Sequence, residues 1–488
     1  MYIERHVYKD FLDWKDNSDL VLLVEGARQV GKTYLATKFA NENFKNVIYI
    51  NIADDTGKVF IDILNKHISI GDEKKLLLNT LIEYSKTFTN TKDTVVIIDE
   101  IQESSLVYNK IRSFNRLMYC RFIVTGSYLG RTSLSNDFWE SAGDFKTITI
   151  YPLSFREFLG AVGNDVVNLF DTIDLYGNSS KESYDLLKEY YNAYISIGGY
   201  PAVVNTFLKE LDMRTVYDLY DKLLLIFAKE SARYLQSEEY IILIKTAFNY
   251  FARLLIREKK GMQNNNAGEE LIKLSKKLNY REGSLNFNKK QYTAVLSWLL
   301  SNYALYGCDK AIDCDLMNIE YNQRFYFNDL GILNYLLINM EIDKDISMGI
   351  RNKNYVCIVL KNKKLMTNFA TFANYELDFL LKDSEHIYGI EVKTGKDSGK
   401  SVMKAYEKGK IDKILYLKGD TYGGVDGNKI TIPIYLFERF NFKPTRYNNL
   451  DNIDIFRKWR LSFLKVIRNK VILKILWFSK KIGGFFNE

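Results

Sequence analysis

The stretch that decides the fold reads Leu20-Val-Leu-Leu-Val-Glu25-Gly26-Ala27-Arg28-Gln29-Val30-Gly31-Lys32-Thr33. It opens with an apolar run of the kind that forms a strand buried on both faces. From Gly26 to Thr33, every fixed position of the pattern G-x-x-x-x-G-K-[ST] is present. A helix is predicted from Lys32 to about residue 44, so the pattern lies between a strand and a helix, as phosphate-binding loops do.

The residue types in this loop suit a phosphate chain. Glycines let backbone N–H groups surround the phosphates without a Cβ in the way, and the helix adds its positive N-terminal end. Lys32 is expected to reach the β- and γ-phosphates, and the Thr33 hydroxyl to bind Mg²⁺. The alternative is a chance glycine-rich turn. The predicted nucleotide-binding residues are Gly26, Ala27, Arg28, Gln29, Val30, Gly31, Lys32, Thr33 and Ser127.

A second apolar run, Thr94–Asp99, ends in the pair Asp99-Glu100. An acid at the carboxyl end of a parallel strand faces the nucleotide crevice, so Asp99 is predicted to hold Mg²⁺ through water. Glu100 is predicted to act on the attacking water as general base or positioner. Lys32 and Glu100 are thus the predicted catalytic residues, and ATP with Mg²⁺ the predicted cofactors. A surface acid after a strand is the alternative.

Two further features of such a site are expected but not assigned. A hydroxyl in Thr125-Gly126-Ser127 would sense the γ-phosphate, although Ser127 would serve equally well as a helix cap. An arginine finger is expected in cis or in trans. Arg131, Arg156 and Arg233 are candidates, and nothing in the sequence selects among them.

Strands alternate with helices through the first 160 residues, which predicts an α/β domain with a parallel sheet. A helix is expected at residues 73–88. Beyond residue 160 the chain is helix-rich to residue 320, with no strong strand in 236–320, and residues 325–440 turn β-rich. The predicted strands are residues 20–25, 47–52, 94–99, 121–125, 147–151, 325–327, 376–381, 387–392, 414–417 and 430–437.

Several blocks together resemble the prokaryotic AAA-type ATPases that carry a C-terminal domain of unknown function. The blocks are residues 25–33, Asp99-Glu-Ile-Gln102, Val124–Ser127, Tyr151-Pro-Leu-Ser-Phe-Arg-Glu-Phe-Leu159 and Gly198-Gly-Tyr-Pro201. The resemblance runs from about Tyr2 to about Gly395. It implies a P-loop ATPase core (1–160), a helical lid (161–235), a winged-helix-like segment (236–320) and a nuclease-like α/β domain (321–445), followed by a tail (446–488).

The nuclease-like domain is suggested by Asp378 on one strand and Glu391-Val-Lys393 on the next, which resemble the PD-(D/E)xK core. In such sites the acids bind Mg²⁺ and the lysine steadies water or phosphate, and alternation along the strands lets all three share one face. The family places a glutamate where this chain has Lys353. That substitution favours a non-cleaving relic or a binding module over an active, ATP-regulated DNA nuclease.

The resemblance to a winged helix rests on residues 268–302. Two helices are expected, at 269–278 and 288–300, and the second presents Lys289, Lys290, Gln291 and Thr293 at the end where recognition helices meet DNA. The alternative is a helix face in water.

The charge of the chain is concentrated in one place. Of 68 basic and 60 acidic residues, nine basic residues and one acid fall in 457–488, so the remaining chain carries 59 of each. A body coated with nucleic acid is therefore not indicated, whereas the basic amphipathic tail would suit a membrane surface, a DNA backbone or packing on its own fold. The four scattered cysteines and three histidines make no metal spacing. We predict free thiols and a cytoplasmic location, because no signal-like or membrane-spanning run occurs.

Two classes of function remain open. In the first, ATP turnover drives a DNA-directed enzyme or remodeller; in the second, the chain is a nucleotide-switched interaction module with little turnover. Candidate partners are double-stranded DNA, a protein, a membrane surface through the tail, and a second copy of the chain.

Overall fold

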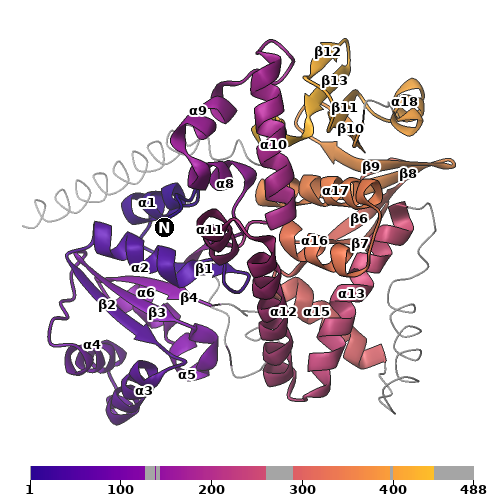
Figure 1. Ribbon diagram of the computed structural model, residues 1–488. Helices are drawn as coiled ribbons and strands as arrows, with labels where there is room; N and C mark the ends of the chain where they lie inside the picture. Colours follow the sequence, from indigo (N-terminus) through magenta and orange to yellow (C-terminus); the bar gives the residue numbers. More distant parts are fainter. Residues whose placement is uncertain (1, 127–137, 139–142, 260–288, 396–398, 444–488) are drawn as a thin grey trace, which may run out of the picture.

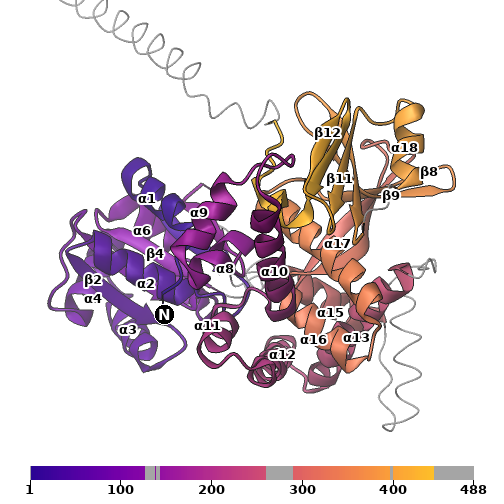
Figure 2. The same cartoon turned by 45° about the horizontal axis from the view of Figure 1, so that its top comes forward.

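The computed structural model describes residues 2–126, 138, 143–259, 289–395 and 399–443. Two sheets form its two ends, and a group of helices lies between them (Figures 1 and 2). The predicted α/β class is confirmed at both ends. The basic tail, Ser127, Arg131 and the predicted helix at 269–278 lie outside the described residues.

The N-terminal sheet has five strands in the order β2-β3-β4-β1-β5, and each neighbouring pair is parallel. Its strands are β1 (Val21–Gly26), β2 (Asn46–Asn51), β3 (Thr94–Asp99), β4 (Arg121–Thr125) and β5 (Phe145–Ile150). Its helices are α1 (Tyr8–Asn17), α2 (Lys32–Asn43), α3 (Asp55–His67), α4 (Glu73–Tyr84), the 3₁₀ turn η1 (Ile101–Glu103), α5 (Ser105–Tyr108) and α6 (Ile111–Leu117).

Both faces of this sheet are buried, which explains why its strands read as continuous apolar runs. Val95 and Ile97 belong to one hydrophobic cluster, whereas Val96 and Ile98 belong to another. Successive side chains point to opposite faces of a strand, so one apolar run fills two cores. Burying each such side chain stabilises the fold by about 1.5–3 kcal/mol.

The middle helices pack between the two sheets. They are α8 (Phe155–Val162), α9 (Asn164–Thr172), α10 (Lys181–Ile197), α11 (Pro201–Glu210), α12 (Met213–Leu235), α13 (Glu239–Lys259) and α15 (Lys289–Ser301). Helices α12 and α13 pack against each other as an antiparallel pair (Figure 1). The helix-rich character predicted for residues 161–235 is thus confirmed.

The C-terminal sheet has eight strands in the order β12-β13-β11-β10-β9-β8-β6-β7 and mixes parallel and antiparallel pairs. Its strands are β6 (Leu305–Ile312), β7 (Ile319–Phe327), β8 (Asn368–Phe372), β9 (Tyr375–Lys382), β10 (Ile387–Lys393), β11 (Lys413–Lys418), β12 (Gly424–Asp426) and β13 (Lys429–Pro433). Its helices are α16 (Leu330–Asn339), α17 (Lys344–Asn362), α18 (Lys400–Glu407) and the 3₁₀ turn η2 (Ile434–Arg439).

Three sequence predictions differ from the structure, one in a missed strand and two in their boundaries. No strong strand was expected in 236–320, but β6 lies there; its polar residues and glycine obscure the strand pattern, and pairing with β7 and β8 establishes it. The strand expected at 430–437 ends at Pro433, which has no N–H to donate, and continues as η2. The helix expected at 73–88 ends at Tyr84, because Ser85 is extended.

The start of helix α8 connects the 3₁₀ turn η2 of the C-terminal part to the middle helices. Ser154 caps the helix in a capping box with Glu157. The next two N–H groups, of Phe155 and Arg156, donate to the Glu438 carboxylate at 2.7 and 3.1 Å. A negative group at a helix N-terminus satisfies unpaired donors and complements the helix dipole. The Tyr151–Leu159 block therefore connects the middle helices to the C-terminal part of the fold.

The Gly198–Pro201 block forms a second connection next to this one. The Leu153 N–H donates to the Gly199 carbonyl at 2.6 Å, so the two blocks are hydrogen-bonded to each other. Asp329, which is buried, accepts the Gly199 N–H at 2.6 Å and the Tyr220 hydroxyl at 2.9 Å. These blocks therefore hold the C-terminal half against the middle helices.

Gly198→Ala is expected to disrupt this connection between the C-terminal half and the middle helices. Gly198 has φ +84°, and an added Cβ would lie 2.6 Å from the Asp329 carboxylate and 2.6 Å from the Gly331 nitrogen. We expect the free energy of unfolding to fall by roughly 3 kcal/mol or more, because a strained backbone and an overpacked core add. Urea unfolding of the full-length variant measures the loss.

The matched control is Gly71→Ala, since a Cβ at Gly71 meets nothing within 4 Å. It should unfold close to the wild type. Equal unfolding midpoints for the two alanine variants would show that Gly198 is not constrained by its surroundings.

Candidate functional site

The loop between β1 and α2 takes its shape from two glycines. Gly26 has φ +137°, and a side chain there would meet the Ile150 carbonyl of β5. Gly31 has φ +93° at the start of α2, a left-handed conformation that residues other than glycine rarely adopt. No side chain caps α2, so its first N–H groups remain available to an anion.

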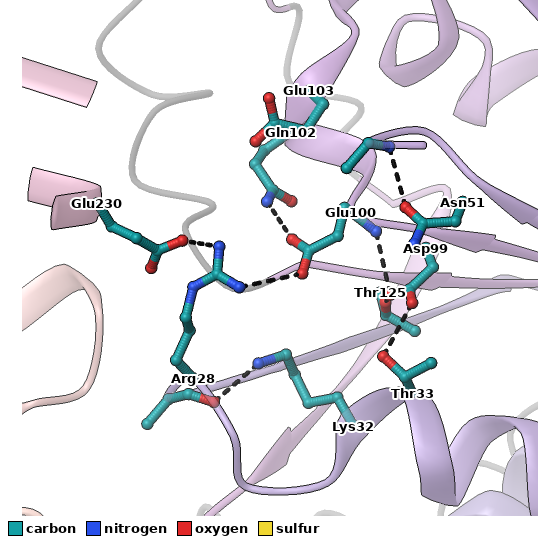
Figure 3. Close-up of polar contacts among 12 residues, drawn as sticks. Arg28, Lys32, Thr33, Asn51, Asp99, Glu100, Gln102, Glu103, Thr125 and Glu230 are labelled. Atoms are coloured by element: carbon teal, nitrogen blue, oxygen red, sulfur yellow. Dashed lines mark hydrogen bonds and ion pairs between the residues drawn. The ribbon is translucent and has the colours of Figure 1, made fainter. Parts of the chain in front are cut away.

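Lys32 lies folded over this loop (Figure 3). Its ammonium donates to the carbonyls of Gly26 at 3.0 Å and Ala27 at 2.8 Å. The side chain is buried, and burial lowers the pKa of Lys32 to about 8. A buried cation that donates to neutral carbonyls suits a site that receives negative charge.

Asp99 is surrounded by hydroxyl groups at the end of β3. Its carboxylate accepts from Thr33 at 2.9 Å and from Thr125 (Figure 3). It also accepts from the Tyr49 hydroxyl at 2.7 Å. It is only 4% exposed, and among the described residues it forms no ion pair with a cation. An oxygen-rich cluster around one carboxylate is the donor set that Mg²⁺ prefers, so the predicted pair Thr33 and Asp99 fits this ion.

Glu100 follows in the left-handed conformation, with φ 53°. Its carboxylate accepts from the Gln102 amide and lies 3.6 Å from the Arg28 guanidinium (Figure 3). Glutamate residues rarely adopt the left-handed backbone conformation, and such conformations are enriched at functional sites. The turn aims the carboxylate away from the hydroxyl cluster around Asp99 and toward the phosphate loop.

Arg28 connects the loop to helix α12. Besides Glu100, its guanidinium forms an ion pair with Glu230 of that helix (Figure 3). One turn further along α12, Arg233 and Tyr234 both contact Glu103, the tyrosine hydroxyl at 2.6 Å. Helix α12 is thus fixed to both sides of the site.

A cavity of about 400 Å³ lies beside the phosphate loop. The N-terminal segment, the loop and helix α11 line it together, through Ile3, Val30, Tyr34, Leu35, Pro201 and Asn205. Its walls are mainly apolar, and its volume is in the range of small-ligand pockets.

The structure brings together most of the residues predicted for this site and separates others. Of the arginine-finger candidates, Arg233 lies beside the site, whereas Arg156 is held by Asp171 of α9. Sequence reasoning missed Tyr49 and Glu230. Tyr49 sits on a strand neighbouring the one that ends in Asp99, which is a signal; nothing in the sequence ties Glu230 to Arg28.

The predicted C-terminal cluster also assembles. Lys353 of α17 lies 2.6 Å from Asp378, whose second oxygen accepts the Val392 N–H at 2.8 Å, and Lys393 lies 2.8 Å from Glu391. Burial favours the protonated form of Asp378, but the ammonium of Lys353 outweighs it and the pKa of Asp378 is lowered. Burial and the neighbouring Asp378 raise the pKa of Glu391 to about 7.

The winged-helix prediction is neither confirmed nor refuted. Helix α15 is present, but its Gln291 donates to Glu239 of α13 at 3.0 Å, and Trp298 is buried against the core. The hairpin β6–β7 that follows belongs to the eight-stranded sheet.

Other expectations concern bonds and ions. The four cysteines are free and buried, as predicted. Over the described ranges, no group of three or more His, Cys, Asp or Glu side chains could hold a metal ion. In that same part of the chain, no helix is long and apolar enough to cross a membrane.

Comparisons with known proteins agree with the fold of the N-terminal part of the chain. Residues 18–159 match the model of a family described as an AAA domain, and residues 188–343 match a domain of unknown function. No curated protein matches. Residues 18–159 are therefore similar to an AAA domain, and residues 188–343 are similar to a domain of unknown function.

Three solved structures show distant similarity. The Walker-type ATPase of Pyrococcus abyssi is 15% identical over 69% of this chain and 96% of its own, with a TM-score of 0.39. The Aeropyrum pernix Orc1 protein in complex with DNA is 12% identical over 70% and 94%, with a TM-score of 0.25. The Thermotoga maritima RuvB Holliday junction branch migration motor is 14% identical over 62% and 90%, with a TM-score of 0.28.

Proposed function

We propose that this protein binds ATP with Mg²⁺, hydrolyses it, and transmits the state of the site through helix α12 to a C-terminal domain that engages DNA or a partner protein. The observation that carries the proposal is the meeting of Lys32, Thr33 and Asp99, since Thr33 and Asp99 come from separate elements and lie within 2.9 Å. A lysine beside a hydroxyl and a carboxylate at the ends of parallel strands is the arrangement that P-loop ATPases use.

Each residue has a role in this proposal. Lys32 neutralises the β- and γ-phosphates, and Thr33 with Asp99 would hold Mg²⁺, which when bound spreads the charge of these phosphates. Glu100 orients the attacking water and takes its proton. Its left-handed turn and the hydrogen bond from Gln102 support that role, because they fix the carboxylate on the loop side.

A specific observation favours the second candidate function, a nucleotide-dependent switch with little turnover. The guanidinium of Arg28 stands beside Glu100 and is also paired with Glu230. The ion pair with Arg28 competes with the attacking water for the Glu100 carboxylate. Slow hydrolysis would follow if Arg28 kept this position in the nucleotide complex.

One purified-protein assay separates the two candidates. ATP hydrolysis is measured with Mg²⁺, with EDTA, and with Mg²⁺ plus double-stranded DNA. A rate that needs Mg²⁺ and rises with DNA supports the DNA-directed motor. Tight nucleotide binding with negligible turnover and no effect of DNA supports the switch.

The cavity beside the loop is assigned to the nucleotide base, and Tyr34→Ala tests this. Tyr34 lines the cavity yet is 59% exposed, so its loss should affect stability little. We expect the Kd values for ATP and ADP to rise on the order of tenfold, the scale of one lost contact between an aromatic ring and a base. Binding of a fluorescent ADP analogue measures the change.

Tyr119→Ala is the matched control, because Tyr119 is 66% exposed and does not line this cavity. Its affinity should equal that of the wild type. If both tyrosine variants bind nucleotide like the wild type, the base lies elsewhere.

A further inference from the structure

A second charged cluster lies far along the chain from the ATPase site, where β9, β10, α13 and α17 meet (Figure 1). Its members are the acids Glu258, Glu376, Asp378 and Glu391 and the bases Lys259, Arg324, Lys353 and Lys393. The resemblance to PD-(D/E)xK nucleases implies that Asp378 and Glu391 hold Mg²⁺. The residues present can be tested against that implication.

The position beside Asp378 is taken by a cation that the chain itself supplies. Lys353 extends from α17 with 16% of its side chain exposed, and its ammonium lies 2.6 Å from one Asp378 oxygen. The same ammonium lies 3.8 Å from Glu258 of α13. The other Asp378 oxygen accepts the Val392 N–H at 2.8 Å. Both oxygens of this carboxylate are therefore engaged.

The two oxygens of the Glu391 carboxylate differ in their contacts. One of its oxygens lies 2.8 Å from Lys393, whereas the other is buried and has no hydrogen-bond partner among the residues that the structure describes. The side chain is only 5% exposed. A Cβ on Gly399, at the start of α18, would collide with the Glu391 carboxyl group, so the backbone closes over it. Unpaired buried carboxylate oxygens are costly and call for an explanation.

The rest of the cluster is paired internally. Arg324 lies 3.0 Å from Glu258 and 2.5 Å from Glu376, with 8% of its side chain exposed. Four acids and four bases balance to zero formal charge, so a divalent cation would bring an uncompensated double charge beside the Lys353 ammonium. Repulsion between like charges is strong where little water screens them. The wild-type cluster does not fit the implied metal.

We propose that the ammonium of Lys353 stands in for the divalent cation at this position, so that the C-terminal cluster is a fixed set of ion pairs in the wild type and becomes a metal site when Lys353 is replaced. Asp378 and the free oxygen of Glu391 are the ligands that the replacement makes available. The proposal is independent of the nucleotide site. It assigns the cluster to holding α13, α17 and β9 together rather than to metal-dependent cleavage.

The test uses the full-length protein without nucleotide and MnCl₂ as the probe. Two variants remove the ammonium: Lys353→Gln keeps a hydrogen-bond donor for Asp378, and Lys353→Glu adds a carboxylate. Bound Mn²⁺ is counted by electron paramagnetic resonance, and thermal unfolding is compared in EDTA and in MnCl₂. Lys344→Gln, an exposed position at the start of the same helix, is the matched control.

The wild type and Lys344→Gln should bind no Mn²⁺ at this cluster, and each should unfold at the same temperature in both buffers. Both Lys353 variants should unfold at a lower temperature in EDTA and recover part of the loss in MnCl₂, with one Mn²⁺ per chain in Lys353→Glu. Adding Asp378→Asn to Lys353→Glu should abolish the bound Mn²⁺. Folding of each variant in EDTA or in MnCl₂ is checked by circular dichroism.

Three results would overturn the proposal. One is Mn²⁺ bound to the wild type and lost in Asp378→Asn, because the native cluster would then be a metal site. Another is the absence of Mn²⁺ binding and of any Mn²⁺-dependent stabilisation in both Lys353 variants. The last is Mn²⁺ binding by Lys353→Glu that survives Asp378→Asn, which would place the ion elsewhere.

Discussion

Lys32→Ala is expected to abolish ATP turnover and to weaken nucleotide binding sharply. The substitution removes the buried ammonium that now rests on the Gly26 and Ala27 carbonyls, while the backbone of the loop stays in place. The transferred phosphoryl group then loses its fixed positive partner, and charge stabilisation is most of what this chemistry demands of the protein. Hydrolysis of ATP and binding of a fluorescent nucleotide are measured together.

Lys38→Ala is the control for this experiment, because Lys38 lies on the same helix but forms a surface ion pair with Glu42. It should hydrolyse ATP like the wild type. Wild-type turnover in Lys32→Ala would show that the phosphate site is not in this loop.

Glu100→Gln is expected to lower turnover by about 10² or more while ATP binding is kept. Glutamine matches glutamate in size and still accepts from Gln102, but it is too weak a base to take a proton from water. The loss of the ion pair with Arg28 leaves Arg28 paired with Glu230, so the loop stays attached to α12. Single-turnover hydrolysis and equilibrium ATP binding report the two quantities separately.

Glu103→Gln serves as the matched control, since Glu103 lies three residues later and contacts α12 rather than the loop. It should retain far more activity than Glu100→Gln. A parallel loss of binding and turnover in Glu100→Gln would place Glu100 among the Mg²⁺ ligands instead.

The five-stranded sheet was predictable because burial on both faces leaves a mark that local sequence shows directly. Residues 94–99 and 121–125 were predicted at the bounds that the structure has. Strand β6 was not predictable in the same way. Its residues Leu305–Ile312 include glycine, aspartate and lysine. Its strand conformation depends on pairing with β7, the other strand of its hairpin, and with β8, which begins only at Asn368.

The same contrast between local sequence patterns and long-range packing applies to the residues of the candidate site. Lys32, Thr33 and Asp99 sit in patterns whose spacing is fixed by local chain geometry, so sequence alone places them together. Glu230 reaches Arg28 only because α12 crosses the site, and that crossing is set by tertiary packing. The position of Lys353 beside Asp378 was suggested by a family pattern, but only the structure shows the ammonium in contact with the carboxylate.

The Glu438 carboxylate that binds the start of α8 has a consequence for how the chain is made. Its partner Phe155 precedes it by 283 residues. Ribosomes add roughly 5–20 residues each second, so the amides of Phe155 and Arg156 wait on the order of tens of seconds during synthesis before their acceptor emerges. The N-terminal sheet, whose pairings lie within the first 150 residues, can form in that interval. The nascent chain is therefore expected to pass through a stage in which the ATPase core is folded and protease-resistant while α8 is still open to cleavage.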